Sequence, residues 1–542
     1  MTDLITAAPE RSAVLDDAHV GDIKGAFGTI KLGDNGARAG LSPKIKTLLA
    51  VVGPGLIVMC GDNDAGAFST YGQAGQDYGT SLLWVLLLLV PVLYVNQEMV
   101  VRLGAVTGVG HGKLIIERFG RFWGAFSVID LFLLNALTLV TEFIGITLAV
   151  GYLGLPKAPS ILAAAAVVIG AASTGSFRRF ERVAMTLCFG SLILVPIALV
   201  LHPGAGQMAS GFLVPAMPGG AGQLSTVMLL VIGLVGTTVA PWQLFFQQSY
   251  VIDKRITTRF LKYEKADLWI GIVIVVVGAA AIIGFASAAT AGTAAHGNFT
   301  DTAGLAGAIA AKSGHLLGIL FAIALLDASV IGAFAVSLST AYAIGDVCGV
   351  NHSLHRGVKQ AKGFYGVYVG VIGLAAGIVL IPGAPLGLIT NGVQAMAGVL
   401  LPSASVFLLL LCNDKEVLGP WVNGRRTNLF TSTVLGVLVM LSVVLTASVL
   451  FPSIGAGQIL GIMAVCAVAG LAAGGYALTH RGPAPAIDRR GAEDWRMPPL
   501  AVLGRTELSA GKRIGMGALR GYLVISALLV IVKVIELSLA AH

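Results

Sequence analysis

Thirteen apolar runs, each long enough to cross a bilayer as a helix, follow one another along almost the whole chain. About 20 apolar residues span the hydrocarbon core, and a backbone in lipid must satisfy its own hydrogen bonds, which favours helices. Only 11% of the residues are charged, against about a quarter in soluble proteins. The sequence therefore predicts an all-α polytopic membrane protein whose surroundings are a lipid bilayer. The expected spans are 46–72, 80–103, 124–152, 158–174, 183–202, 226–251, 268–290, 315–345, 363–382, 386–411, 430–451, 455–479 and 515–538.

Lysine and arginine alternate from loop to loop, as expected if they collect on the cytoplasmic side. Basic loops follow spans two, four, six, eight, ten and twelve, and Lys157 and Lys312 are the visible exceptions in the loops between them. This pattern predicts a multi-pass protein of the plasma (cell inner) membrane with its N-terminus in the cytoplasm and, after thirteen spans, its C-terminus outside. It also accounts for the net charge of +8, so no nucleic-acid partner is expected. Residues 1–43 lack a basic segment followed by an apolar core, which predicts a polar cytoplasmic tail and no cleaved signal peptide.

Two of the spans are interrupted by residues that a membrane helix normally avoids. Asp62, Asn63 and Asp64 lie inside the first span, and Pro241 lies inside the sixth. Ionisable groups at membrane depth are costly and tend to mark ion or substrate paths, while proline removes an amide donor. If spans one to five and six to ten form an inverted repeat, the two broken helices face each other and expose carbonyl oxygens that suit a hard cation.

Several other kinds of site are excluded. The five cysteines show no pairing pattern, and the nine histidines lie in loops, tails or span ends, so neither a disulfide framework nor a zinc site is expected. The segment Gly108–Lys113 resembles a phosphate loop but has the wrong glycine spacing and no following hydroxyl. A membrane enzyme would need a catalytic motif, and neither H-E-x-x-H nor G-x-S-x-G occurs. No enzymatic activity and no cofactor are expected.

A series of short motifs follows in order along the chain, beginning at the first break. They are Asp64-Ala65-Gly66-Ala67-Phe68-Ser69-Thr70, Gln73-Ala74-Gly75, Tyr78-Gly79, Gln97, Arg102-Leu103-Gly104-Ala105-Val106-Thr107-Gly108, Phe177-Arg178-Arg179-Phe180-Glu181, Gln394, Leu401-Pro402, Asn413-Asp414-Lys415-Glu416-Val417-Leu418-Gly419 and Asn423. These motifs resemble those of the natural resistance-associated macrophage protein (NRAMP) family of divalent-metal transporters, whose motif at the first break is D-P-G-N-F-A-T. The resemblance implies a LeuT-like fold with an inverted 5+5 helix repeat, broken helices 1 and 6, and about 12–13 transmembrane helices.

The expected organisation follows from that fold and from the spans. The N-terminal tail covers 1–43, and the transport core covers 44–412, with its two repeats at about 44–203 and 224–412. Additional transmembrane helices occupy 413–479, a basic cytoplasmic linker 480–514, and a C-terminal transmembrane helix 515–542.

The resemblance also implies a set of metal ligands, some of which this chain has lost. Asp64 keeps the family's aspartate, and the carbonyls of Gly61 and Thr237 occupy the positions of its backbone ligands. Ala67 replaces the family's asparagine, and Ala240 replaces its methionine. The remaining expected contacts and pocket-lining residues are Gln243 and Gln394 as outer contacts, and Asp62, Trp242 and Gln247 in the lining.

The lost ligands change the expected cargo. Thioether sulfur favours softer transition metals, whereas oxygen and water suit Mg²⁺, Ca²⁺ and Mn²⁺. Mg²⁺ usually keeps several of its waters, so a wider pocket lined only by oxygen suits a partly hydrated ion. The pattern resembles the NRAMP-related magnesium transporter branch, and we expect Mg²⁺ as substrate with Mn²⁺ second.

Proton coupling is the second departure from the family. Trp242 and Gln247 stand where the family's helix-six histidines would be, and neither titrates near neutral pH. Glu142 matches a family glutamate, but Leu139 replaces an aspartate. We therefore expect metal flux without proton coupling, with Glu142, Asp130 and Asp327 as candidates for the ion pathway. Because an unpaired charge within a span is costly, Asp130 and Asp327 are each expected to face a water-filled path, to pair with another group, or to be protonated. Two alternatives stay open: a proton-coupled Mn²⁺/Fe²⁺ transporter of the same family, and a sodium-coupled transporter of amino acids or other small organic solutes.

Overall fold

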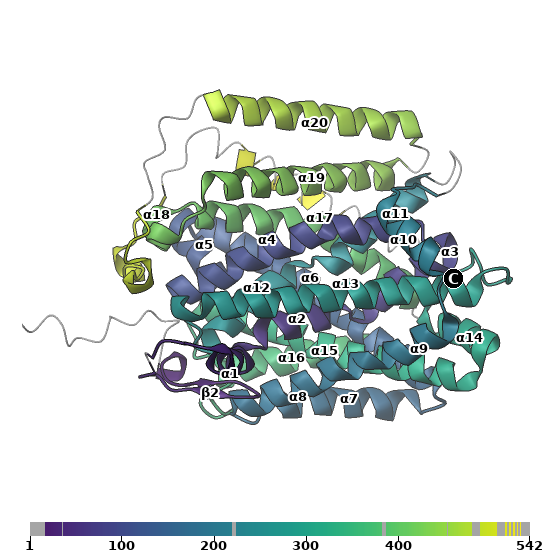
Figure 1. The fold of residues 1–542 in the computed structure, drawn as a ribbon, viewed down its shortest axis with the longest axis horizontal. Helices are drawn as coiled ribbons and strands as arrows, with labels where there is room; N and C mark the ends of the chain where they lie inside the picture. Colours follow the sequence, from purple (N-terminus) through teal and green to yellow (C-terminus); the bar gives the residue numbers. More distant parts are fainter. Residues whose placement is uncertain are drawn as a thin grey trace, which may run out of the picture.

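A computed structural model describes residues 17–34, 36–218, 224–381, 386–451, 454–479 and 488–506, together with scattered positions between 515 and 532. Long helices run side by side along one direction (Figure 1). Within these residues nine helices are long and apolar enough to cross a membrane, or ten if one bent pair counts as a single span. Two shorter apolar helices cover Lys157–Ala172 and Gly457–Ala472. The all-helical polytopic fold is therefore confirmed, while the expected thirteenth span, 515–538, lies largely outside the described residues.

The first half of the core begins with a broken helix and ends with a kinked one. Its helices are α2 (Pro54–Asp62), α3 (Ala65–Tyr78), α4 (Leu83–Thr107), α6 (Arg121–Tyr152), α7 (Lys157–Ala172), α8 (Phe177–Gly190) and, after the 3-10 turn η2 (Ser191–Ile193), α9 (Leu194–Leu201). The fifth span therefore starts at Phe177, six residues before the expected position.

The second half repeats this order. Its helices are α11 (Leu224–Thr238), α12 (Pro241–Asp253), α13 (Leu261–Thr290), α15 (His315–Cys348), α16 (Lys362–Val379) and α17 (Leu386–Cys412). Two further long helices follow, α19 (Arg425–Leu450) and α20 (Ala456–Thr479). As predicted, the first and sixth spans are each divided into two helices, α2 with α3 and α11 with α12.

Short elements close the two ends of the bundle. At one end, which we call the basic end because the lysine- and arginine-rich loops after α4, α12 and α15 gather there, lie α1, α5 and α18, with β2; α10 and α14 lie at the opposite end (Figure 1). Their bounds are α1 (Leu41–Val51), α5 (His111–Phe119), α10 (Ala205–Leu213), α14 (Thr302–Ser313), α18 (Lys415–Leu418), β1 (Ile23–Lys24) and β2 (Thr29–Ile30).

The broken helices lie inside the bundle. Both halves of the first pack against α13, α12 packs between α4 and α15, and α15 packs along α6. Residues of α12 from Pro241 to Asp253 are all buried. Such burial on every side is expected of a helix whose whole surface is covered by other helices.

The first expected span, 46–72, differs from the structure at both ends. Its start belongs to a separate helix, α1, which is bent by 53° from α2, and its end extends to Tyr78. Gly53 forms the bend with a φ of +152°, and a Cβ added there would lie 2.3 Å from Glu181 Oε1. Hydropathy does not register this bend because the residues on both sides of Gly53 are apolar.

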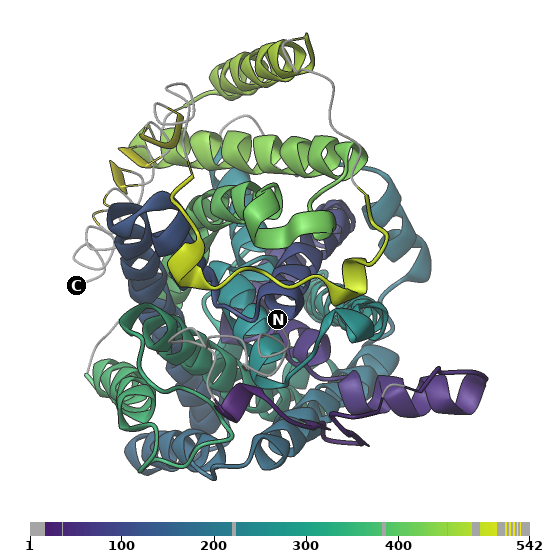
Figure 2. The same ribbon diagram turned by 90° about the vertical axis from the view of Figure 1, so that its left-hand side faces the viewer.

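The tail and the basic linker both pack on the basic end. Strands β1 and β2 pair antiparallel, with Ile23 opposite Ile30, and bury both side chains. Residues 488–506 cross the basic end (Figure 2), where Trp421 Nε1 donates to the Ala492 carbonyl at 2.8 Å.

Candidate metal site

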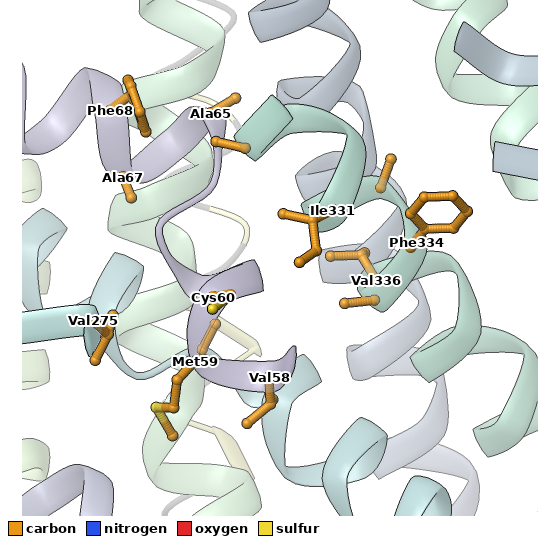
Figure 3. Packing of buried hydrophobic residues seen from close by; sticks show 14 of the residues in the cluster. Val58, Met59, Cys60, Ala65, Ala67, Phe68, Val275, Ile331, Phe334 and Val336 are labelled. Carbon is orange, nitrogen blue, oxygen red and sulfur yellow. The ribbon is translucent and has the colours of Figure 1, made fainter. Parts of the chain in front are cut away.

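The first break is formed by three consecutive polar residues. Helix α2 ends at Asp62, Asn63 follows it, and Asp64 caps α3 by accepting a hydrogen bond from the Ala67 amide at 2.8 Å. Figure 3 shows the non-helical link between Cys60 and Ala65, with α15 facing it through Ile331. A carboxylate is a favourable cap because it satisfies an amide that has no helical partner. Asp64 is therefore held at the break by the fold itself.

The second break follows from Pro241. Helix α11 ends at Thr238, and α12 begins at Pro241 with Ala240 before it in an extended conformation. Proline suits the first position of a helix because its missing amide would have no partner there. Across the two breaks, Tyr71 Oη and Thr238 Oγ1 lie 2.7 Å apart, which ties α3 to α11.

Each break frees backbone carbonyls, because the last carbonyls of a helix have no intrahelical partner. In a continuous helix the Gly61 carbonyl would accept from the Ala65 amide, but that amide donates to Glu142 Oε2 at 3.2 Å. The Thr237 carbonyl would need an amide hydrogen at position 241, where proline has none. The two carbonyls that the resemblance implies as ligands are therefore among those that lose their helical partners.

Asp64 is flanked by side chains from two other helices. Gly66 lies directly against Gln394 of α17, because a Cβ added to it would be 1.7 Å from Gln394 Nε2 and 3.2 Å from Asp64 Oδ1. Gly332 of α15 lies against Glu142 and Asp64 in the same way, because a Cβ added to it would be 2.6 Å from Glu142 Oε2 and 3.0 Å from Asp64 Cβ. The two glycines let these polar side chains meet at the break.

Several polar atoms around the breaks are buried without a hydrogen-bond partner. They are Asp62 Oδ2, Asn63 Oδ1, Thr237 Oγ1, Glu142 Oε1 and Gln394 Nε2. Native proteins satisfy nearly all of their buried polar groups, and the exceptions call for an explanation such as an ion or a water. No group of three or more histidine, cysteine or acidic residues suited to a metal occurs in the described part of the chain, so a cation here must rely on fewer than three such side chains, together with carbonyls and amides.

Gln243, expected as an outer contact, already has protein partners. Its Nε2 donates to Asp62 Oδ1, and its Oε1 accepts from Gln97 Nε2 at 3.1 Å. These two hydrogen bonds join α2, α12 and α4. Sequence reasoning matched Gln97 to the family without placing it at the site, although a glutamine in an otherwise apolar span was the signal for it.

Trp242 and Gln247 are both fully buried on α12. Trp242 Cη2 would lie 3.5 Å from a Cβ added to Gly61, so the indole packs against the end of α2. Gln247 lies further along α12, beside Glu264 of α13. Of these two, only Trp242 contacts the first break.

The structure does not bring Asp130 or Asp327 to the breaks. Asp130 is half-buried on α6, twelve residues before Glu142 and therefore about 18 Å away along the helix axis. Asp327 packs against Gly190 of α8, where an added Cβ would lie 2.4 Å from its Oδ1. Among the three expected pathway residues, Glu142 alone lies beside Asp64.

The site is closed to solvent. Asp62, Asn63 and Asp64 are 1%, 5% and 3% exposed. Toward α14, a cavity of about 10 Å³ is lined by Ala65, Thr141, Asp301 and Thr390, among others. This volume is about the size of one water.

Toward the basic end, Asp267 of α13 accepts from the amides of Gly53 at 3.1 Å, Gly55 at 2.7 Å and Leu56 at 3.3 Å, and so fixes the start of α2. Sequence reasoning missed Asp267, although it stands at the edge of an apolar span.

The chain is similar in sequence to a known protein family and to known transporters, and similar in fold to solved structures. The family model described as natural resistance-associated macrophage protein-like matches residues 55–448. The chain is 29% identical over 410 residues to the divalent metal cation transporter MntH of Deinococcus radiodurans, covering 70% of this chain and 86% of that protein. It is also 29% identical to MntH of Ralstonia nicotianae, covering 71% and 88%. A crystal structure of the Eremococcus coleocola manganese transporter superposes with a TM-score of 0.60 at 19% identity, covering 81% of this chain and 95% of that one, which shows a shared fold.

Proposed function

The chain belongs to the natural resistance-associated macrophage protein-like family, and on that premise we propose that it carries Mg²⁺ across the membrane by alternating access, with Mn²⁺ as second substrate. Its general activity is divalent metal cation transport, in keeping with its MntH relatives. The choice of metal and the driving force rest on this chain's own residues.

The single observation that carries the proposal is the donor set at the two breaks. Asp64 supplies a carboxylate, Gly61 and Thr237 supply carbonyls freed from helical bonding, and Gln394 lies beside Asp64. Ala67 and Ala240 offer neither an amide nor a sulfur. Oxygen donors suit hard cations, and the few protein ligands suit Mg²⁺, which keeps several waters. The chain thereby resembles the magnesium-transporting branch of the family.

The same residues support transport without proton coupling. Helices α11 and α12 contain no histidine, and Trp242 and Gln247 do not titrate near neutral pH. Glu142 Oε2 accepts from the Ala65 amide, which supports a structural part for this side chain at the break. The membrane potential alone would favour entry of a divalent cation by about 4.6 kcal/mol per 100 mV.

Uptake into proteoliposomes containing the purified chain tests the site. Mg²⁺ and Mn²⁺ flux is expected in the wild type and is expected to be lost in Asp64→Ala. Asp327→Asn removes a carboxylate that lies away from the breaks, so it should retain flux. Full transport by Asp64→Ala would defeat the site assignment.

A pH-sensitive dye inside the same vesicles tests the coupling. No metal-dependent acidification is expected, and acidification would instead favour the proton-coupled Mn²⁺/Fe²⁺ transporter. Inhibition of Mg²⁺ uptake by amino acids, together with sodium dependence, would favour the organic-solute transporter.

The topology is part of the proposal. The transport core covers 44–412, the N-terminus and the basic end face the cytoplasm, and the C-terminus lies outside. Single-cysteine labelling tests this: cysteines introduced at Lys157 and Lys312 should react with a membrane-impermeant reagent in intact cells, and one at Lys359 should not. The reverse pattern would invert the topology.

A further inference from the structure

A second cavity lies at the basic end, far from the two helix breaks. Its volume is about 660 Å³, and it opens between α1, the segment before it and the start of α13. Its lining includes Arg38, Leu41, Lys44, Arg259, Lys262 and Glu493. None of these residues takes part in the metal site, so the cavity needs a separate explanation.

The wall of the cavity is strongly basic. Four of its side chains are cationic, namely Arg38, Lys44, Arg259 and Lys262, and one is acidic, Glu493. Such an excess of positive charge in a concave surface raises the local concentration of anions. The chemistry therefore favours an anionic ligand.

Two of the four cations are fixed by the protein. Arg38 pairs with Asp34 at 2.8 Å, and Arg259 donates to the carbonyls of Asp34 at 3.0 Å and Gly36 at 2.8 Å. Lys44 and Lys262 are exposed, and no acidic residue in the described ranges forms an ion pair with either. These two ammonium groups are thus available to bind an anion in the cavity, whose wall is held in place by the contacts of Arg38 and Arg259.

The helix beside the cavity has the character of an interfacial helix. Leu41, Lys44, Ile45 and Leu48 share one face of α1, at the spacing of successive helical turns, and line the cavity. Leu41 is 74% exposed, Ile45 46% and Leu49 43%, and α1 projects from the side of the bundle (Figure 2). Apolar and basic residues together on such a helix place it at the boundary of headgroups and acyl chains.

We propose that this cavity binds the phosphodiester headgroup of an anionic phospholipid, with Lys44 and Lys262 as its cationic contacts and the acyl chains along Leu41, Ile45 and Leu49. Basic pockets beside membrane helices suit anionic lipid headgroups. The inference stands independently of which metal the chain transports.

Native mass spectrometry of the full chain, titrated with phosphatidylglycerol or with phosphatidylcholine of the same acyl chains, tests the proposal. Wild type is expected to bind phosphatidylglycerol preferentially, and the double variant Lys44→Gln/Lys262→Gln to bind it about tenfold or more weakly, since two cationic contacts with the anionic headgroup are removed. The charge-retaining Lys44→Arg/Lys262→Arg should keep the affinity. Lys157→Gln/Lys312→Gln is the matched control, because it removes the same charge from α7 and α14 and should bind as wild type does.

Four results would overturn the inference. They are equal affinity for the two lipids in the wild type, unchanged affinity in Lys44→Gln/Lys262→Gln, the same loss in the control, and full displacement of the lipid by inorganic phosphate at equal concentration. The last would point to a free phosphate as the ligand. Equal thermal unfolding temperatures of all four proteins without added lipid establish that a lost affinity comes from lost charge.

Discussion

Lys254 and Glu181 form an ion pair of 2.6 Å in which neither side chain is exposed to solvent. Lys254 Nζ also donates to the Val52 carbonyl at 2.8 Å, and Glu181 accepts from the Ala26 amide. The pair therefore joins the end of α12, helix α8, the N-terminal segment and the bend before α2. Because α2 carries one half of the candidate metal site, this pair fixes the position of that half relative to α12, which begins at the other break.

Removing one partner of this pair should destabilise the fold strongly. Glu181→Leu removes the carboxylate that pairs with the buried Lys254 ammonium and leaves only the more distant carboxyl groups of Asp267 and Glu264 near it, and breaking a buried pair in this way costs about 3–5 kcal/mol. Glu117→Gln breaks a more exposed pair, Lys113 with Glu117 at 3.1 Å, and should cost less than about 1 kcal/mol. Thermal unfolding in detergent measures both. Similar shifts for the two variants would show that the buried pair does not hold α2 in place.

Glu142 should act at the break as a hydrogen-bond acceptor. Glu142→Gln keeps an oxygen for the Ala65 amide and is expected to retain metal transport within a few-fold. Glu142→Leu removes that acceptor, so the amide turns back to the Gly61 carbonyl and takes a ligand from the metal, and transport should fall at least about tenfold. Uptake of Mg²⁺ by both variants in proteoliposomes measures this. If Glu142→Gln is as impaired as Glu142→Leu, the carboxylate charge itself is required.

The breaks could be predicted from sequence because their causes are local. Asp62, Asn63, Asp64 and Pro241 are visible as polar or helix-breaking residues in apolar runs, and proline at 241 by itself frees the Thr237 carbonyl. The Gly61 carbonyl is different, because its freedom depends on an acceptor, Glu142, that lies 77 positions away from Ala65. Such pairings are set by how helices pack and leave no periodic signal in the sequence.

The same distinction explains which features the sequence could not place. The bend at Gly53 needs Glu181 and Asp267 from two other helices beside it, so hydropathy continues the first span through it. For Asp130 and Asp327, a place on the ion pathway stays a prediction, because charge in an apolar span does not give the direction of a side chain, which depends on the rotation of α6 and α15. That rotation is settled by packing along the whole length of two helices.

Restoring the thioether should shift the selectivity toward softer metals. Ala240→Met places sulfur at the start of α12, and sulfur favours transition metals over Mg²⁺, so the ratio of Mn²⁺ to Mg²⁺ uptake should rise several-fold. Ala240→Leu is the matched control because it adds comparable volume without sulfur, and each costs about 1–3 kcal/mol of stability from overpacking. Competition uptake assays give the ratio. An equal change in both variants would attribute the effect to size alone.

His352 should make the stability of the fold depend on pH. It lies in the loop between α15 and α16 with its Nε2 3.0 Å from Asp346 Oδ1. Burial lowers the pKa of His352, but the Asp346 carboxylate and, further off, Asp253 outweigh burial and raise this pKa from 6.5 to about 9; His19 faces the same ring at 5.6 Å. Because the folded pKa is the higher one, the stabilisation is complete below about pH 6.5 and is lost as pH rises through about 9.

The size of this pH effect follows from the pKa of His352. A pKa raised from 6.5 to about 9 corresponds to about 3 kcal/mol of stabilisation, so the unfolding temperature of the wild type should fall between pH 6.5 and 9. His352→Gln should unfold at a lower temperature at pH 6.5 and lose most of that dependence, because it cannot carry the charge that pairs with Asp346. His315→Gln changes an exposed histidine at the opposite end of α15 and should leave the profile unchanged. A wild-type profile that rises or stays flat from pH 6.5 to 9 would show that the pair with Asp346 does not stabilise this loop.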